Sequence, residues 1–223
     1  RVLSAAKTAG VERIVVTSSL IAIIAGKLSG HYGTDTWSDP NEEIGTYAKS
    51  KTLAEQAAWE FAKANNIDLV VINPGGVMGP TLTGRVEGES LTMISDIITG
   101  KYPLVPDISV GFIDVRDVAR AHLLAAENNT LQGRHILVNE TLSMFQLTKI
   151  AARLFGARFK FPRSETPKWI MIAIGPVFGV TRKFIRRNVG YPIAFSNEKS
   201  KKEMGIEYTP IVSTIEDMIN SLM

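Results

Sequence analysis

Two short β-branched runs separated by an alanine-rich segment constrain the fold most. Arg13–Thr17 and residues 69–72 each have the composition of a strand buried on both faces. Between them, residues 47–59 are rich in alanine and have the composition of a helix. A strand, a helix and a second strand in this order are typical of a parallel α/β sheet. The sequence therefore predicts an open parallel sheet flanked by helices.

Polar and turn-forming residues follow both strands. The first strand leads into the hydroxyl residues Thr17, Ser18 and Ser19, and the second leads into Pro74, Gly75 and Gly76. Ligands of open α/β sheets bind outside the carboxyl ends of the strands. These residues therefore predict a ligand crevice at one edge of the sheet.

Tyr47 and Lys51 stand four residues apart at the start of the alanine-rich segment. On a helix this spacing puts both side chains on one face, one turn apart. A neighbouring ammonium stabilises a phenolate, so the tyrosine could exchange a proton with a carbonyl or hydroxyl oxygen. The alternative is an ordinary solvated face of the helix, since both residue types are common there.

Five segments, taken together, resemble the extended short-chain dehydrogenase/reductase superfamily of the NAD-dependent epimerase/dehydratase type. Within it, the chain is most similar to the dihydroflavonol reductases, cinnamoyl-CoA reductases and related carbonyl reductases. The resemblance covers nearly the whole chain, in order. It is carried by residues 16–19, 36–39, 47–55, 73–80 and 112–119.

The resemblance implies a role for each candidate site residue. Ser19 would orient a carbonyl oxygen, with Ser18 as its nearest rival, Tyr47 would be the general acid, and Lys51 would tune Tyr47 and hold the nicotinamide ribose. The implied cofactor is NADP or NAD, with NADP preferred. The residues implied to contact it are Thr17, Ser18, Tyr47, Lys51, Pro74, Gly75, Gly76 and Val77. Two glycines at 75 and 76 exceed the family pattern and predict a wider or more mobile pocket wall.

The resemblance also implies the domain organisation. We expect an α/β fold: a partial Rossmann-type, doubly wound parallel sheet with a small C-terminal α+β substrate cap. Residues 1–80 would form the C-terminal half of the dinucleotide-binding domain. Residues 81–223 would be mostly cap, with 110–128 returning to the sheet. The family's glycine-rich pyrophosphate turn is not found, so we expect a fragment whose missing part precedes Arg1.

Composition excludes several other classes of protein. The chain has no cysteine and three scattered histidines, so it offers neither a disulfide framework nor an evident metal set. Its formal net charge of +3 comes from interspersed charges, which does not indicate nucleic-acid binding. No signal peptide and no apolar run of ~20 residues is evident. We therefore predict a cytoplasmic protein with a small-molecule partner, and the resemblance makes a homodimer plausible.

Further local expectations concern the second half of the chain. Asp114 should cap a helix, Ser143 and Gln146 should form a capping box, and Ser213 and Glu216 should form another that opens the last helix. A polar loop is expected over residues 81–89. The apolar residues 169–178 should form a core or pocket-lining helix, with a dimer face or membrane-surface contact as the alternative.

Two further sets of residues have open interpretations. The cluster Arg182, Lys183, Arg186 and Arg187 is either a solvated helix end or a phosphate or CoA contact. Trp37, in the loop between residues 20 and 45, either contacts substrate or anchors that loop.

The preferred hypothesis is an NAD(P)-dependent oxidoreductase that transfers hydride between nicotinamide and a ketone, an aldehyde or a secondary alcohol. A nucleotide-sugar epimerase or dehydratase with the same three residues is the first alternative. A non-catalytic fragment or binding protein on the same fold is the second.

Overall fold

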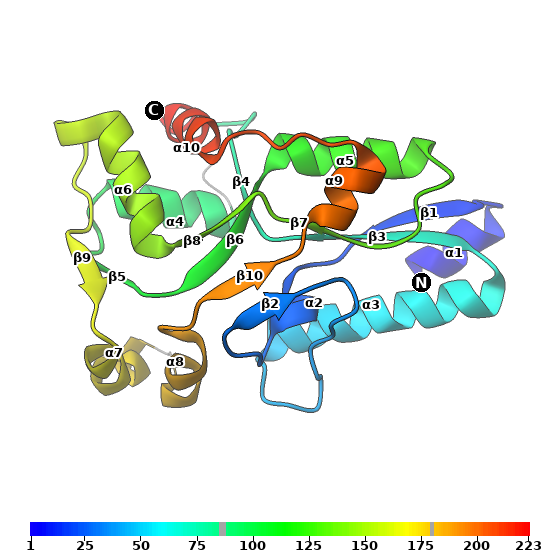
Figure 1. Ribbon diagram of the computed structural model, residues 1–223, viewed down its shortest axis with the longest axis horizontal. Coiled ribbons are helices and arrows are strands. Elements are labelled where there is room, and N and C mark those ends of the chain that lie inside the picture. The colour runs from blue at the N-terminus through cyan, green and yellow to red at the C-terminus, as the bar shows by residue number, and fades with distance from the viewer. Residues whose placement is uncertain (85–87, 179–180) are drawn as a thin grey trace.

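A parallel three-stranded sheet lies at the centre of the part of the molecule that carries the candidate site. The computed structural model describes residues 1–84, 88–178 and 181–223, so the predicted loop over 81–89 falls partly outside the described residues. The strand order is β1 (Arg13–Thr17), β3 (Asp68–Pro74), β7 (Gly133–Leu137), with all strands parallel (Figure 1). The two strands predicted from β-branched runs are therefore adjacent, with Val15 opposite Val70.

Helices cover both faces of this sheet. Helices α1 (Val2–Thr8) and α3 (Thr46–Asn65) pack on one face, where Ala58 and Ala62 contact Leu69 and Val71. Helices α5 (Val115–Glu127) and α9 (Glu198–Met204) cover the other face (Figure 1). Since β3 alternates its side chains between two apolar layers, its central residues are fully buried. The predicted doubly wound α/β fold is confirmed.

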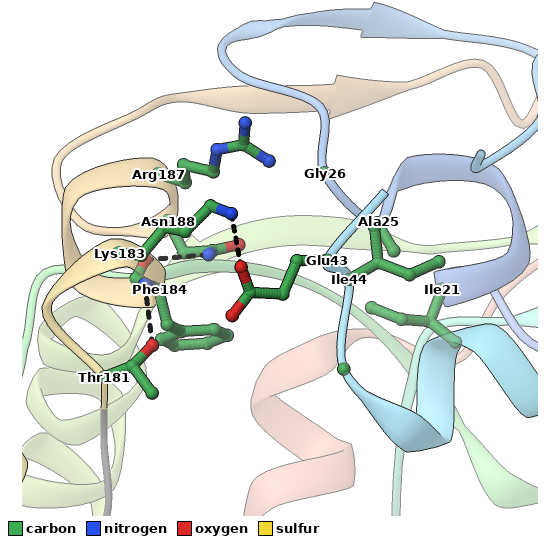
Figure 2. Close-up of a pocket in the computed structure, with 11 residues that line it drawn as sticks. Ile21, Ala25, Gly26, Glu43, Ile44, Thr181, Lys183, Phe184, Arg187 and Asn188 are labelled. Carbon is green, nitrogen blue, oxygen red and sulfur yellow. Dashed lines mark hydrogen bonds and ion pairs between the residues drawn. The ribbon is translucent and has the colours of Figure 1, made fainter. Parts of the chain in front are cut away.

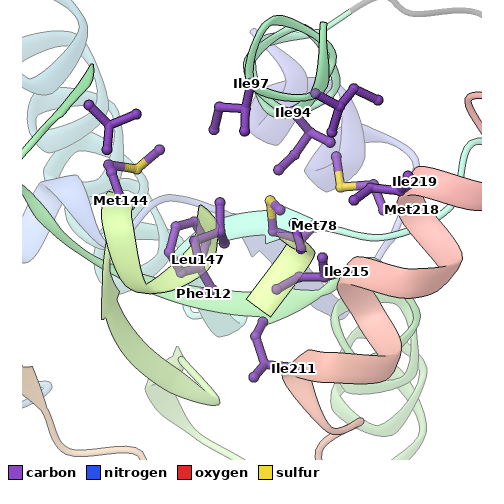
Figure 3. Packing of buried hydrophobic residues seen from close by; sticks show 13 residues of the cluster. Met78, Ile94, Ile97, Phe112, Met144, Leu147, Ile211, Ile215, Met218 and Ile219 are labelled. Atoms are coloured by element: carbon purple, nitrogen blue, oxygen red, sulfur yellow. The ribbon is translucent and has the colours of Figure 1, made fainter. Parts of the chain in front are cut away.

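A second sheet packs against three helices. Strands β4 (Gly76–Met78) and β6 (Ser109–Asp114) pair in parallel, and β8 (Glu140–Ser143) adds to β6 in antiparallel orientation. Met78, Phe112 and Leu147 are buried there among isoleucines of the surrounding helices (Figure 3). Those helices are α4 (Glu89–Ile98), α6 (Met144–Phe155) and α10 (Ile211–Asn220).

Smaller elements complete the described part of the chain. Two parallel two-stranded sheets pair β2 with β10 and β5 with β9. Their bounds, with those of the short helices, are α2 (Ile21–Ile24), β2 (Gly30–Tyr32), β5 (Leu104–Pro106), η1 (Gly156–Arg158), β9 (Ser164–Thr166), α7 (Lys168–Ile174), η2 (Gly175–Phe178), α8 (Arg182–Asn188) and β10 (Ile193–Phe195).

Residues 110–128 contact both sheets. Helix α5 packs on the β1-β3-β7 sheet through Ala121 and Ala125, whereas strand β6 pairs with β4 and β8. The division of the chain at residue 80 stays a prediction.

Two predicted helix starts are confirmed and a third is wrong. Asp114 caps α5 by accepting from the Arg116 N–H, and Ser143 forms its capping box with Gln146. The last helix, however, begins at Ile211, directly after Pro210. Ser213 therefore lies inside the first turn of α10, where it does not cap the helix.

The prediction of a core or pocket-lining helix over residues 169–178 is wrong. Helix α7 ends at Ile174, a 3₁₀ turn containing Pro176 follows, and α7 buries none of its residues. Trp169 is 72% exposed and Val177 is 84% exposed. Because proline cannot continue the helical hydrogen-bond ladder, the apolar run breaks into two short pieces that lie beside α8 at the surface.

Candidate active site at the carboxyl edge of the sheet

The segments that follow β1 and β3 meet at one edge of the sheet. The Leu20 N–H donates to the Pro74 carbonyl over 2.8 Å, and the Ser18 N–H donates to Ile72 over 2.8 Å. The Asn73 amide nitrogen also donates to the Ser19 carbonyl over 3.2 Å. Both predicted strand ends therefore converge as expected for parallel neighbours.

The structure separates the two candidate serines. Ser18 is buried, and its hydroxyl donates to the Glu55 carboxylate. Ser19 is half-buried, and its oxygen accepts the Ile21 N–H over 3.2 Å, which leaves the hydroxyl proton for another acceptor. This geometry favours Ser19 over Ser18 as the residue that donates to a substrate oxygen.

Tyr47 and Lys51 lie on the first two turns of α3. The Tyr47 ring is 62% exposed, and the Lys51 ammonium lies 6.0 Å from the ring centroid. Lys51 is half-buried, and within the described ranges it forms no ion pair with a carboxylate. The pair therefore has the predicted helical geometry, and its polar atoms are available to a ligand.

The Thr17 side chain lies on the face of the sheet that α5 covers, where it contacts His122. His122, on α5, has its Nδ1 2.8 Å from the Val118 carbonyl, which assigns the ring proton to that nitrogen. Its Nε2 then accepts from the Thr17 hydroxyl over 2.6 Å. This bond ties α5 to the end of β1, and the predicted cofactor contact of Thr17 stays a prediction.

The residues predicted to lie beside the nicotinamide continue directly from β3 into β4. Pro74 is buried, and Gly75, Gly76 and Val77 are half-buried. A Cβ atom on Gly75 would come within 2.1 Å of the Gly111 carbonyl oxygen. The glycine at 75 therefore permits close approach of the β6 backbone, which fills the space that the sequence suggested might be left open.

A buried carboxylate that sequence reasoning missed connects these segments. Glu55 is 2% exposed, and besides Ser18 it accepts from Asn73 Nδ2 over 2.8 Å and from Arg134 Nε over 2.6 Å. Its spacing was the available signal, because Tyr47, Lys51 and Glu55 recur every four residues on one helix.

Arg134 extends this network to the loop before α3. Its Nη1 donates to the carbonyls of Thr34 and Thr36 over 3.0 and 2.6 Å, and its guanidinium stacks 3.9 Å from the Trp37 ring centroid. Burial lowers the pKa of Arg134, and the Glu55 carboxylate opposes that shift. Trp37 therefore anchors the loop by stacking on a buried cation.

A cleft of about 400 Å³ is lined in part by residues that are close to Ser19 and Tyr47 in sequence. Ile21, two residues after Ser19, and Ile44, three residues before Tyr47, form part of one wall. Phe184 of α8 faces them across the cleft (Figure 2). Apolar side chains therefore line part of this cleft, together with Glu43, Lys183 and Arg187.

Two ion pairs join the sides of this cleft. Lys183 pairs with Glu43, and Arg187 pairs with Glu42 over 3.1 Å (Figure 2 shows the first pair). The Lys183 hydrogen bond and charge lower the pKa of Glu43. Lys183 and Arg187 of the predicted basic cluster are thus paired with carboxylates of the loop before α3, and neither of these two cations is a free phosphate contact.

The described residues contain neither a candidate metal-binding cluster nor a helix able to span a membrane. No group of three or more histidine, aspartate or glutamate side chains is arranged to hold a metal ion. Within the same ranges, every helix is too short or too polar to cross a membrane.

Comparison with known proteins gives consistent matches. Residues 1–138 match the NAD dependent epimerase/dehydratase family. Cinnamoyl-CoA reductase CAD2 of Medicago truncatula is 33% identical over 226 residues, which is 98% of this chain and 63% of the relative. The chain thus spans less than two thirds of the length of that curated relative.

Solved structures match over nearly the whole chain. The crystal structure of gox2253 has a TM-score of 0.78 at 26% identity and covers 98% of this chain and 68% of that protein. Yeast methylglyoxal/isovaleraldehyde reductase Gre2, complexed with NADPH, has a TM-score of 0.76 at 25% identity and covers 99% and 67%.

Proposed function

This chain belongs to the NAD dependent epimerase/dehydratase family, and we propose that it transfers hydride between NADP or NAD and a ketone, an aldehyde or the corresponding secondary alcohol. The observation that supports the proposal is that Ser19 follows β1 at the carboxyl edge of a parallel sheet, while Tyr47 and Lys51 lie one turn apart on α3. Ile21, Ile44 and Gly45, which are near Ser19 and Tyr47 in sequence, line a cleft. The similarity to reductases of cinnamoyl-CoA and of methylglyoxal supports a carbonyl substrate.

The chain's own groups fit a nicotinamide cofactor. Lys51 lacks a carboxylate partner among the described residues and would bind ribose hydroxyls, while the half-buried segment after Pro74 would pack beside the nicotinamide ring. When bound, the cofactor supplies or accepts the hydride. NADP is preferred over NAD, since the similar Gre2 structure is a complex with NADPH.

Ser19, Tyr47 and Lys51 would each act on the substrate oxygen or on the proton it receives. The Ser19 hydroxyl donates a hydrogen bond that orients the carbonyl, and Tyr47 delivers a proton to the same oxygen. The Lys51 ammonium, on the next turn of the helix, stabilises the phenolate that Tyr47 leaves behind.

The cleft favours a neutral, apolar substituent on the substrate. Ile21, Ile44 and Phe184 supply apolar surface, and the cations on the cap side are already paired with Glu42 and Glu43. Burying apolar surface is favourable, whereas a second anion would have to displace a carboxylate from its partner.

A carbonyl panel tests this function directly. The full-length protein is mixed with NADPH and with aryl and alkyl aldehydes and ketones, and loss of the reduced cofactor is followed by absorbance. We expect turnover of neutral aryl carbonyls. Failure to oxidise NADPH with any member of the panel contradicts the proposal. Protein that instead purifies with tightly bound NAD and converts a nucleotide sugar favours the epimerase alternative.

Phe184→Ala tests where the substrate lies. Removing this wall of the cleft should raise KM for a bulky aryl carbonyl by about tenfold, because one to two kcal/mol of apolar contact is lost. KM for a small aldehyde should change by less than about twofold, since it does not reach α8. Val177→Ala is the matched control, because Val177 is exposed in η2 and does not line the cleft. If Phe184→Ala and Val177→Ala change KM equally for the bulky aryl carbonyl and for the small aldehyde, the aryl substituent does not bind against Phe184.

Domain division, assembly and location are also part of the proposal. Residues 1–80 would serve the cofactor and most of 81–223 the substrate. A homodimer and a cytoplasmic location rest on the sequence predictions alone.

A further inference from the structure

Glu55 contacts groups from three separate parts of the fold. Its carboxylate oxygens accept from Ser18 after β1, from Asn73 at the end of β3 and from Arg134 on β7. All four residues are at most 7% exposed. A buried carboxylate with this many donors holds their relative positions, since each lost bond would leave a polar group unsatisfied.

These contacts join the two halves of the proposed catalytic set. The Ser19 carbonyl accepts a hydrogen bond from the Asn73 amide, which also donates to Glu55. The hydroxyl of the preceding residue, Ser18, donates to Glu55 as well. Tyr47 and Lys51 belong to the same helix as Glu55. Glu55 is therefore the side chain through which the serine segment and the tyrosine helix share one anchor.

We propose that Glu55 is a positioning residue, which sets the Ser19 hydroxyl relative to Tyr47 and, through Arg134, fixes the Thr34–Trp37 segment to the same point. The inference rests on the proposed function for its catalytic part. Its structural part, the coupling of Trp37 to Glu55, stands on the contacts of Arg134 alone.

Glu55→Gln is the informative substitution because every group around the carboxylate is a donor. Ser18 Oγ, Asn73 Nδ2, Arg134 Nε and, at 3.5 Å, Trp59 Nε1 all point hydrogens at it. A carboxylate only accepts. A glutamine NH₂ would face either Asn73 Nδ2 or Arg134 Nε, neither of which can accept, even if the Ser18 hydroxyl turns to accept from it. The side-chain shape is kept while the anchor is lost.

The kinetic test is a double-mutant cycle in the full-length protein. Glu55→Gln should lower kcat by about 10- to 100-fold, the size expected when a reacting group is misplaced by about 1 Å, and should change KM for NADPH by less than about twofold. In a Ser19→Ala background the same substitution should cost less than about twofold more, because its effect passes through Ser19. Glu60→Gln, on the exposed face of the same helix, is the matched control and should behave as wild type.

Additive losses in the cycle, or wild-type kcat in Glu55→Gln, would overturn the proposal. If Glu55→Gln yields no folded protein, Ser18→Ala takes its place in the cycle, since it removes one donor and leaves the ion pair with Arg134. Its expected loss in kcat is about two- to tenfold, again suppressed in the Ser19→Ala background.

A second readout separates this inference from the proposed function. The chain has three tryptophans, so 5-fluorotryptophan labelling gives three ¹⁹F signals that can be assigned by substitution. Glu55→Gln should shift or broaden the Trp37 signal through Arg134 and leave that of the exposed Trp169 unchanged. If the wild-type protein turns over no carbonyl, the proposed function fails. The Trp37 signal then tests the structural part alone: a change in Glu55→Gln supports the coupling of Trp37 to Glu55, and no change overturns it.

Discussion

Replacing Tyr47 with phenylalanine is expected to lower turnover of a carbonyl substrate by about 100- to 10,000-fold, the range typical of general acid–base catalysis. The substitution removes only the phenolic oxygen, so the ring that lies beside the Lys51 ammonium remains. Since the Tyr47 side chain is 62% exposed, its loss should not disturb the core. The measurement is steady-state NADPH oxidation by the full-length protein, with NADPH binding followed separately by fluorescence.

Cofactor binding should change little, because Tyr47→Phe alters only one of the implied cofactor contacts and leaves Lys51 and the Pro74 segment intact. Tyr102→Phe is the matched control: it removes a hydroxyl from another half-exposed tyrosine outside the candidate site. The described partners of Tyr102 are Asp96, which accepts from its hydroxyl, and the Lys101 ammonium over its ring. Turnover of Tyr47→Phe within about threefold of wild type would remove Tyr47 from the mechanism and leave the helical pair as an ordinary solvated face.

Local patterns were sufficient to predict the sheet and the segments at its edge. The β-branched run at Arg13–Thr17 has the bounds of β1, but β1 is an edge strand whose residues are half-buried or exposed, and only β3 is the buried strand that this composition predicts. The four-residue spacing of Tyr47 and Lys51 translates directly into one helix face, since α3 is regular over its length.

Tertiary contacts account for what the sequence did not reveal. Arg134 occurs in a strand of otherwise ordinary composition, and only the folded chain brings it to Glu55, 79 positions away. The glycine at 75 predicted a wider pocket wall, but the Gly111 backbone of β6 approaches so closely that it leaves no room for a Cβ atom there. Neither relation has a local signature, because strand neighbours in a crossover fold are distant in sequence.

Surface and core are also hard to distinguish for short apolar runs. Residues 169–178 have the hydropathy of a buried helix, yet Trp169 and Val177 are exposed. The proline at 176 predicts the break in the helix but not which face is covered. The start of α10 shows the same limit. Both Pro210 and Ser213 are residue types that often begin a helix, and in the folded chain the helix begins after Pro210.

His135 should make the folded state less stable as the pH falls below about 6.5. The ring is fully buried on β7, and burial, together with the positive charge of Lys199, lowers its pKa from 6.5 to about 4, while Glu203 at 3.8 Å opposes the shift. The unfolded chain therefore binds a proton near pH 6.5, whereas the folded protein does so only near pH 4. The stability that the neutral ring contributes is fully present above about pH 7 and is lost progressively as the pH falls from about 6.5 to about 4.

The full loss is roughly 3 kcal/mol, from about 1.4 kcal/mol for each pH unit between the two pKa values. Urea unfolding at pH 7.5 and pH 5 measures most of it. Carboxylates titrate at the lower end of the same range, so the difference between wild type and His135→Phe isolates the histidine: the variant should lose about 2 kcal/mol less on going to pH 5. His31→Gln is the control, because His31 is exposed. A pH dependence identical in wild type and His135→Phe would mean that the ring takes up its proton in the folded state, and that α9, which carries Lys199 and Glu203, opens or rearranges to admit it.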